Sequence, residues 1–315
     1  MLQEFAGWRF LSDFIIPGAS VSSPASAAGA SLAPPDVVIV REPVPEALEA
    51  PVITHPVWQV SANGETLLTL PGIARFLISE GCRVVIEPAP GADPVTIGFL
   101  VSGPVLAVLS RQRGLVPLDG AAVGWQGGAL LIIGPSGQGK SSIAASLATR
   151  GWPVLADGVL AISPSAPALV RGWPRLRLWR QTAQTLGIDL GTAPALRYGI
   201  ERYDIGWPEH PEQPGGPWPL SGIVIVLNRA PTATCERLTP GRAAVRLGSS
   251  LWVRPTYTDS TAASAVLQDL IGLAVRIPCW HLTPPETLGA LGATADLLTE
   301  TLRAQKEAPG HAASA

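Results

Sequence analysis

Apolar residues near the start of this chain occur in short runs separated by turn-forming residues. Runs of four to six apolar or alternating positions between glycine and asparagine clusters are typical of strands. The longest such segment contains Ala62-Asn63-Gly64 at its centre, which favours a hairpin turn. The predicted strands are Trp8–Leu11, Val37–Val40, the two arms of Trp58–Leu70, Ile73–Ile78 and Arg83–Glu87. The last two are expected to form a second hairpin around Glu80-Gly81.

Two stretches between these strands have compositions typical of irregular structure. Residues 17–36 are rich in Ala, Ser, Pro and Gly, and Pro43–Pro56 contains four prolines. A helix is then predicted over Val95–Arg111, with Asp93 as its N-cap and Pro94 at its first position. Residues 1–114 therefore read as a small β-rich N-terminal domain closed by a helix.

From Gly114 the pattern changes to alternating strands and helices, which is typical of an α/β fold. A long loop is expected over Ile205–Pro219, which holds five prolines and three glycines. We predict a second domain over residues 115–303, followed by a disordered tail at 304–315. The predicted strands are Leu115–Val123, Ala129–Ile133, Pro153–Ala156, Leu176–Trp179, Leu220–Leu227, Arg237–Leu238 and Trp280–Leu282. The predicted helices are Ser141–Arg150, 179–187, Arg242–Leu247, a helix capped by Asp259 or Ser260 and ending near Val275, and Glu286–Arg303.

One motif in this second region carries recognisable chemistry. Between a predicted strand and a predicted helix, the chain matches the phosphate-binding pattern G-x-x-x-x-G-K-[ST]. Glycine amides and a helix N-terminus can surround phosphate oxygens, the lysine reaches the β- and γ-phosphates, and the hydroxyl after it binds Mg²⁺. The chain has only two lysines, and one of them occupies this position. The predicted nucleotide-binding residues are Gly134, Pro135, Ser136, Gly137, Gln138, Gly139, Lys140, Ser141 and Ser142.

Two aspartates near this motif are candidate catalytic residues beside Lys140. Asp157 follows the predicted strand Pro153–Ala156, and a carboxylate at the end of a parallel strand beside the loop strand could bind Mg²⁺ with Ser141 or accept a proton. Asp119 ends another candidate strand and could orient or deprotonate an acceptor. Each aspartate precedes a glycine, so a turn role is the alternative for both.

For several arginines and tryptophans, the sequence gives weaker evidence of a functional role. A basic cluster could hold phosphates or an acidic peptide, although a solvated face is favoured in so arginine-rich a chain. Trp179 and Trp280 are expected in the core, whereas Trp207 and Trp218 flank the proline-rich loop and are candidates for a peptide groove. The basic cluster is Arg171, Arg175, Arg177 and Arg180, and further candidates for phosphate contacts are Arg197, Arg202 and Arg254.

Composition narrows the function classes. The net charge of −2 gives no reason to expect nucleic-acid binding or attraction to an anionic membrane. The three cysteines form no CxxC pair and no metal set with the four histidines. No signal peptide is apparent and the apolar runs are of strand length. We therefore expect a cytoplasmic protein with no membrane or nucleic-acid partner.

The segments around the phosphate-binding motif resemble the HPr kinase/phosphorylase family. They resemble more closely the HPr-kinase-like proteins found beside peptide-modification genes, including lasso-peptide clusters. The resemblance implies a P-loop kinase core related in fold to phosphoenolpyruvate carboxykinases. The matching segments are Gly72–Phe76, Arg111–Gly114, Leu118–Val123, Gly134–Ser142, Val154–Gly158, Leu176–Trp179 and Pro219–Ile223.

This chain departs from the family pattern at two positions. The family usually has a histidine where Asp119 stands, and two consecutive acids where this chain has Asp157-Gly158. One carboxylate would then serve the metal, the acceptor hydroxyl, or both.

The resemblance implies a kinase that transfers the γ-phosphate of ATP, or of GTP, to a serine of a peptide or small protein with Mg²⁺. A biosynthetic precursor peptide is the favoured acceptor. Three alternatives stay open: an HPr-type regulatory kinase/phosphorylase, a small-metabolite kinase, and a nucleotide-binding regulator without catalysis. HPr kinases assemble as hexamers, so the resemblance also implies a homo-oligomer.

Overall fold

The computed structural model describes residues 1–21, 34–170, 172–196, 199–208, 216–252 and 260–307, and it shows a mixed α/β protein. Among these residues, the first nine strands form one sheet in the order β3-β1-β2-β4-β9-β8-β7-β6-β5. Strand β4 pairs in parallel with β2 and β9, and the other neighbours are antiparallel. The strands are β1 Leu2–Phe5, β2 Trp8–Ser12, β3 Ser20–Val21, β4 Val37–Arg41, β5 Pro51–His55, β6 Trp58–Ser61, β7 Thr66–Leu70, β8 Ala74–Ser79 and β9 Arg83–Pro88.

The hydrophobic pattern located most of this sheet correctly, including both hairpins. Two predictions of irregular structure were wrong. Strand β5 lies inside the proline-rich stretch 43–56, where it forms an edge strand and pairs only with β6. Proline is tolerated at such an edge because its missing N–H need not face a partner. Strand β3 lies within the predicted loop 17–36, of which residues 22–33 are outside the described part.

The predicted helix after this sheet forms, but in three parts. Helix α1 (Pro94–Leu100) leads into the π-helical turn η2 (Val101–Val105) and then into α2 (Leu106–Gln112). Asp93 caps α1 as predicted, because its carboxylate accepts hydrogen bonds from the backbone N–H groups of the second and third helical residues. The interruption has a local cause, since Gly103 has non-helical angles and Pro104 follows it.

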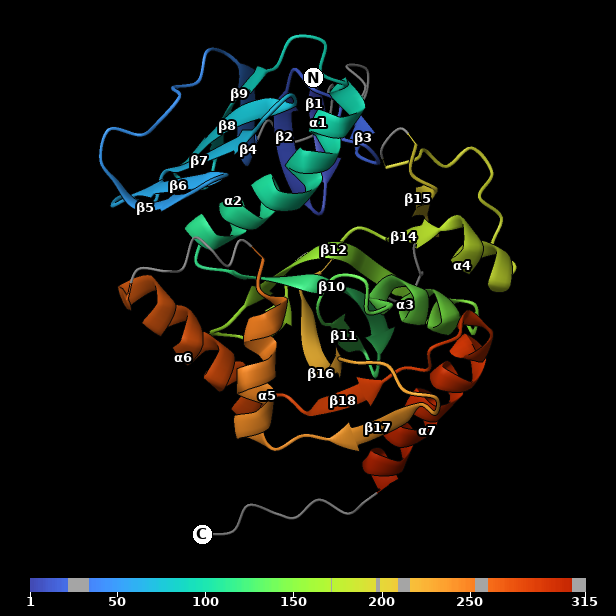
Figure 1. Ribbon diagram of the computed structural model, residues 1–315. Helices are drawn as coiled ribbons and strands as arrows, with labels where there is room; N and C mark the ends of the chain where they lie inside the picture. Colours follow the sequence, from blue (N-terminus) through green and yellow to red (C-terminus); the bar gives the residue numbers. More distant parts are fainter. Residues whose placement is uncertain (22–33, 171, 197–198, 209–215, 253–259, 308–315) are drawn as a thin grey trace.

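The second half of this helical segment, η2 and α2, lies between the two main sheets of the molecule (Figure 1). Its apolar side chains join a core with residues of the first sheet, and α2 also contacts β10 and β12 of the second. The sequence predicted no segment that could span a membrane. By length and composition Pro94–Gln112 could do so, with a mean hydropathy of 1.5, although 61% of that window is buried in the protein.

The second sheet is built around the phosphate-binding motif. In the described residues its strands follow the order β11-β10-β12-β13-β16-β18-β17, and β11 also pairs with β16, so β10, β11, β12, β13 and β16 close into a ring. A separate ribbon joins β14 to β15. The strands are β10 Val116–Trp125, β11 Gly128–Ile133, β12 Val154–Ser163, β13 Ala168–Leu169, β14 Arg175–Trp179, β15 Arg202–Gly206, β16 Trp218–Val226, β17 Thr234–Arg237 and β18 Cys279–Thr283.

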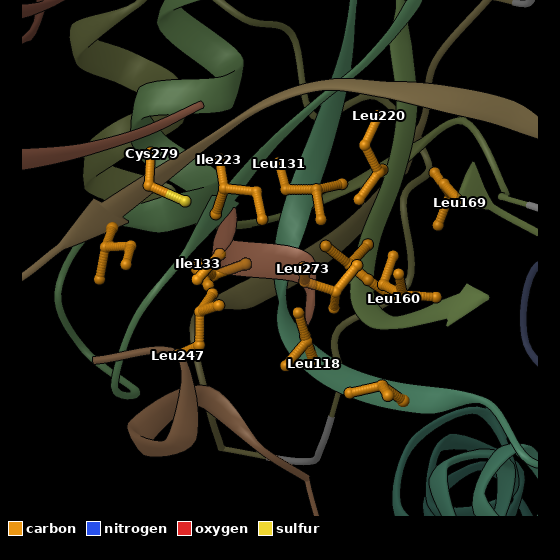
Figure 2. Close-up of a cluster of buried hydrophobic side chains, with 14 of the residues drawn as sticks. Leu118, Leu131, Ile133, Leu160, Leu169, Leu220, Ile223, Leu247, Leu273 and Cys279 are labelled. Carbon is orange, nitrogen blue, oxygen red and sulfur yellow. The ribbon is translucent and has the colours of Figure 1, made fainter. Parts of the chain in front are cut away.

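Helices cover both faces of this sheet (Figure 1). Helices α3 and α7 pack against one face, and α5 and α6 against the other. Figure 2 shows the second of these cores, where Leu118, Leu131 and Ile223 of the strands gather with Leu247 and Leu273 of the helices. The helices are α3 Lys140–Ala148, α4 Arg180–Thr185, α5 Pro240–Leu247, η3 Gly248–Ser250, α6 Ser260–Arg276, η5 Leu288–Ala290 and α7 Leu291–Glu307.

The structure can be compared with the prediction at the end of helix α7 and at the start of helix α6. Helix α7 continues to Glu307, so the predicted tail begins too early, and residues 308–315 lie outside the described part. Helix α6 begins at Ser260 as expected, whereas the alternative cap Asp259 is not among the described residues.

The topology corrects the expected placement of both aspartates. Asp157 is the fourth of ten residues in β12, and Asp119 is the fourth of ten in β10, so neither ends its strand. Strand β12 runs in the same direction as β11, but β10 lies between them and is antiparallel to both. The predicted parallel neighbour of the loop strand is instead β16.

Candidate functional site

The phosphate-binding motif forms the connection between β11 and α3, as its sequence predicted. Strand β11 is fully buried, and α3 starts at Lys140 with Ile143, Ala144 and Leu147 facing the core. Gly134, at the start of the loop, has φ of +150°, and a Cβ there would lie 2.2 Å from the carbonyl oxygen of Val226. Only glycine allows the loop to leave the sheet this close to β16.

Lys140 is held by an ion pair inside the site. Its Nζ donates hydrogen bonds to Asp119 Oδ2 and to the carbonyl oxygen of Pro135, each at 3.0 Å. The lysine side chain is only 8% exposed, and that of Asp119 is 28% exposed. A buried ammonium group needs such a partner, so Asp119 offsets the charge of Lys140.

Asp119 and Asp157 share one face of the sheet. The register of β10 and β12 sets Asp119 opposite Val159 and Ala121 opposite Asp157. The two aspartates are therefore diagonal neighbours, a relationship that places Cα atoms roughly 7–8 Å apart. Alternation along each strand directs both side chains toward the face that α3 covers.

Asp157 connects the loop helix to the β14–β15 ribbon. Ser141 Oγ donates a hydrogen bond to Asp157 Oδ1 at 2.9 Å, and the backbone N–H of Arg177 donates to Oδ2 at 2.7 Å. Burial raises the pKa of Asp157 to about 6, although the Arg177 N–H, the charges of Arg177 and Arg202 and the Ser141 hydroxyl all act to lower it. The carboxylate therefore changes protonation state close to neutral pH.

Gly158 has a structural reason to be glycine. Its φ is +117°, and a Cβ there would come within 3.0 Å of Arg177 Nη1. The Arg177 guanidinium occupies this space and also donates a hydrogen bond to Ser102 Oγ in the π-helical turn η2. An acidic residue at position 158 would strain the backbone and displace Arg177.

These groups line one cavity with a volume of about 850 Å³. It contains both aspartates, Lys140 and most of the phosphate-binding loop. The volume lies within the range of small-molecule and cofactor sites, roughly 300–1,000 Å³. Its wall also includes Arg177, Trp179 and Gln181 from the ribbon and α4, Arg229 after β16, and Trp252 after η3.

The site has a donor set that suits a hard divalent cation bound together with phosphates. The Ser141 hydroxyl and Asp157 carboxylate already lie within hydrogen-bond distance of each other. Within the described parts of the chain, no group of three or more His, Cys, Asp or Glu side chains could hold a metal. Mg²⁺ commonly takes only one or two protein oxygens and completes its shell with water and phosphate, so these residues fit that ion.

The structure places only some of the candidate arginines at the cavity. Arg177 and Arg202 reach the cavity, whereas Arg175 pairs with the buried Asp204 and Arg180 pairs with Glu201. The remaining candidates, Arg171, Arg197 and Arg254, lie outside the described residues. Arg229 lines the cavity and was missed, because an isolated arginine after a strand gives no sequence signal.

The structure also changes the expected positions of several tryptophans. Trp280 is buried in the core as predicted, but Trp179 is 53% exposed at the cavity, so its core assignment was wrong. Trp207 and Trp218 pack against the two cores of the second sheet and are not among the cavity residues. Trp252 was overlooked, and its Nε1 lies 3.4 Å from the carbonyl oxygen of Gly158.

No known protein-family model matches this chain, and no curated protein matches it in sequence. The functional argument therefore depends on the geometry of the site.

Proposed function

We propose that this protein is an ATP-dependent kinase with a P-loop core of the HPr-kinase type, which phosphorylates a serine of a peptide or small protein. The observation that carries the proposal is the contact between Ser141 and Asp157 inside a cavity that also holds Lys140. A loop that merely turned between β11 and α3 would not need a lysine, a hydroxyl and a carboxylate converging on one cavity.

The loop supplies the phosphate-binding groups in this proposal. Backbone N–H groups at the start of α3 and the glycines before it bind phosphate oxygens, and the helix dipole favours their negative charge. Lys140 moves from Asp119 to the β- and γ-phosphates, since an ammonium–phosphate contact replaces the carboxylate contact. Ser141 and Asp157 would hold Mg²⁺, which would neutralise charge on the phosphates.

Transfer then requires an oriented hydroxyl. The serine oxygen of the acceptor forms a bond to the γ-phosphorus while the bond from that phosphorus to the β–γ bridging oxygen breaks, and ADP leaves. The hydroxyl proton passes to a carboxylate, either Asp157 or Asp119. Both side chains line the cavity that would hold the γ-phosphate, so either is within reach of an acceptor bound there.

A polypeptide acceptor accords with the open side of the cavity. Trp179 presents an exposed indole there, and Arg177 and Arg202 contribute positive charge. Aromatic and arginine side chains are enriched where proteins bind other polypeptides. The proposal of a biosynthetic precursor peptide depends on the sequence resemblance alone.

The decisive experiment incubates the purified protein with γ-labelled ATP, Mg²⁺ and precursor peptides encoded near its gene. We expect label on a serine of one peptide, loss of labelling with Lys140→Ala, and none when the serine is alanine. GTP and a set of small hydroxyl metabolites serve as competing substrates. ATP binding with no transfer to any acceptor would contradict the kinase assignment and favour a nucleotide-binding regulator.

A further inference from the structure

Arg229 enters the cavity from the side opposite to Asp157. Strand β16 is the parallel neighbour of β11, whereas β12, which carries Asp157, lies on the other side of β11 beyond β10. After β16 the chain turns at Asn228, whose φ is +59°. Asparagine tolerates this left-handed conformation better than most residues, and the turn directs Arg229 back toward the phosphate-binding loop.

The Arg229 guanidinium lies directly against that loop. Its Nη2 donates a hydrogen bond to the carbonyl oxygen of Gly137, and its Nη1 donates to the carbonyl oxygen of Pro285, each at 3.2 Å. A Cβ added at Gly139 would lie 3.5 Å from Nη2. The two carbonyl contacts fix the guanidinium beside the segment that would surround the phosphates.

The charge of Arg229 has no acidic counterpart. Among the described residues, no carboxylate lies within ion-pair distance of its guanidinium, and both of its hydrogen-bond partners are neutral. Lys140, the other cation of the loop, is instead neutralised by Asp119. Arginine stays charged at every physiological pH and matches phosphate geometry with its planar set of donors.

We propose that Arg229 binds the phosphate chain of the nucleotide, so that the chain lies between Arg229 on one side and the Ser141–Asp157 pair on the other. This inference rests on the nucleotide binding in the proposed function and adds a residue that no motif marks. The guanidinium retains free donors beyond its two carbonyl contacts, because it has five N–H groups. Arg229 lines the cavity that would receive two or three phosphates.

A pair of substitutions tests the role of the charge. Arg229→Lys keeps the positive charge, whereas Arg229→Gln keeps a donor for the Gly137 carbonyl but removes the charge. Arg242→Gln, which breaks a surface pair with Glu236, is the matched control. Calorimetric titration with ATP and with ADP in Mg²⁺ gives the affinities, and thermal unfolding of each ligand-free variant reports on loop packing.

We expect Arg229→Gln to weaken ATP binding by about tenfold or more, and Arg229→Lys by only about threefold, with the control unchanged. The inference is overturned if Arg229→Gln binds ATP as tightly as the wild type. Equal losses in the lysine and glutamine variants also overturn it, because the carbonyl contacts and not the charge would then determine affinity.

The same titrations separate this inference from the proposed function. A wild-type protein that binds no nucleotide contradicts both. Normal ATP binding without transfer to a peptide contradicts the kinase assignment alone, and the Arg229 comparison is still decided by the binding data. Full transfer activity with unchanged ATP affinity in Arg229→Gln contradicts only the inference about Arg229.

Discussion

Ser141 donates a hydrogen bond to Asp157 across 2.9 Å, although the strand that carries Asp157 is not adjacent to the strand that leads into the loop. The contact is possible because Ala121 of β10, the residue paired with Asp157, is small and faces α3, which starts at Lys140. A hydroxyl and a carboxylate thus meet at the first turn of the helix, where an anion and its cation would bind.

Replacing this hydroxyl tests the metal site. We expect Ser141→Ala to lower Mg²⁺-dependent ATP affinity and phosphate transfer by about tenfold or more, because one of two oxygen ligands is lost. Thr149→Ala is the control, since Thr149 Oγ1 donates a hydrogen bond to the Ser146 carbonyl oxygen at the far end of α3 and Thr149 is not among the cavity residues. Titrations with and without EDTA provide the measurement. Similar losses in both variants would argue against a metal ligand at Ser141.

The raised pKa of Asp157 predicts a pH-dependent stability. Its pKa moves from an ordinary value of 3.8 to about 6 on folding, so the folded state binds a proton more tightly than the unfolded state. This stabilisation is complete below about pH 4 and is lost as the pH rises to about 6, with a total of at most about 3 kcal/mol.

The variant Asp157→Asn isolates that effect because it does not ionise. Without Mg²⁺, the Tm of the variant minus the Tm of the wild type should increase from pH 4 to pH 7 and then level off. All other titrations are common to both proteins and cancel in the difference. A difference that stays constant over this range would mean that Asp157 is not desolvated.

The chain has Gly158 where the HPr kinase family usually has a second acidic residue, and restoring that acid gives a prediction. We expect Gly158→Asp to destabilise the protein by about 1–3 kcal/mol and to leave transfer no faster, because position 158 has φ of +117° and contacts Arg177. Gly158→Ala has the same backbone strain without the charge and serves as the control. Urea unfolding and the labelled-ATP assay measure the two effects. An aspartate variant with wild-type stability and faster transfer would contradict this reading.

Asp119 is expected to hold Lys140 in the ligand-free protein. Asp119→Asn should destabilise that state, because it leaves a buried ammonium group without its carboxylate. ATP affinity should not fall and should rise by a few fold, since Asp119 no longer competes with the phosphates for Lys140. Calorimetry and thermal unfolding check both effects. A clear loss of ATP affinity would show that Asp119 supports nucleotide binding directly.

Local patterns predicted the elements of this protein more successfully than their neighbours in space. The hairpins around Asn63-Gly64 and Glu80-Gly81, the cap at Asp93 and the loop between β11 and α3 all follow from interactions within a few residues. The edge strand β5 was missed because its pairing with β6 outweighs the local preference of the prolines in and around it.

The amino-acid sequence by itself determined the glycine-rich loop between β11 and α3, with its lysine and serine, because these depend on the order of residues along one short segment. Only the tertiary structure decided what surrounds them. It paired β10 with β12, paired Asp119 with Lys140, and placed Arg229 against the loop. These contacts join residues 21 to 92 positions apart, and strand pairing and burial set such distances, not any local pattern.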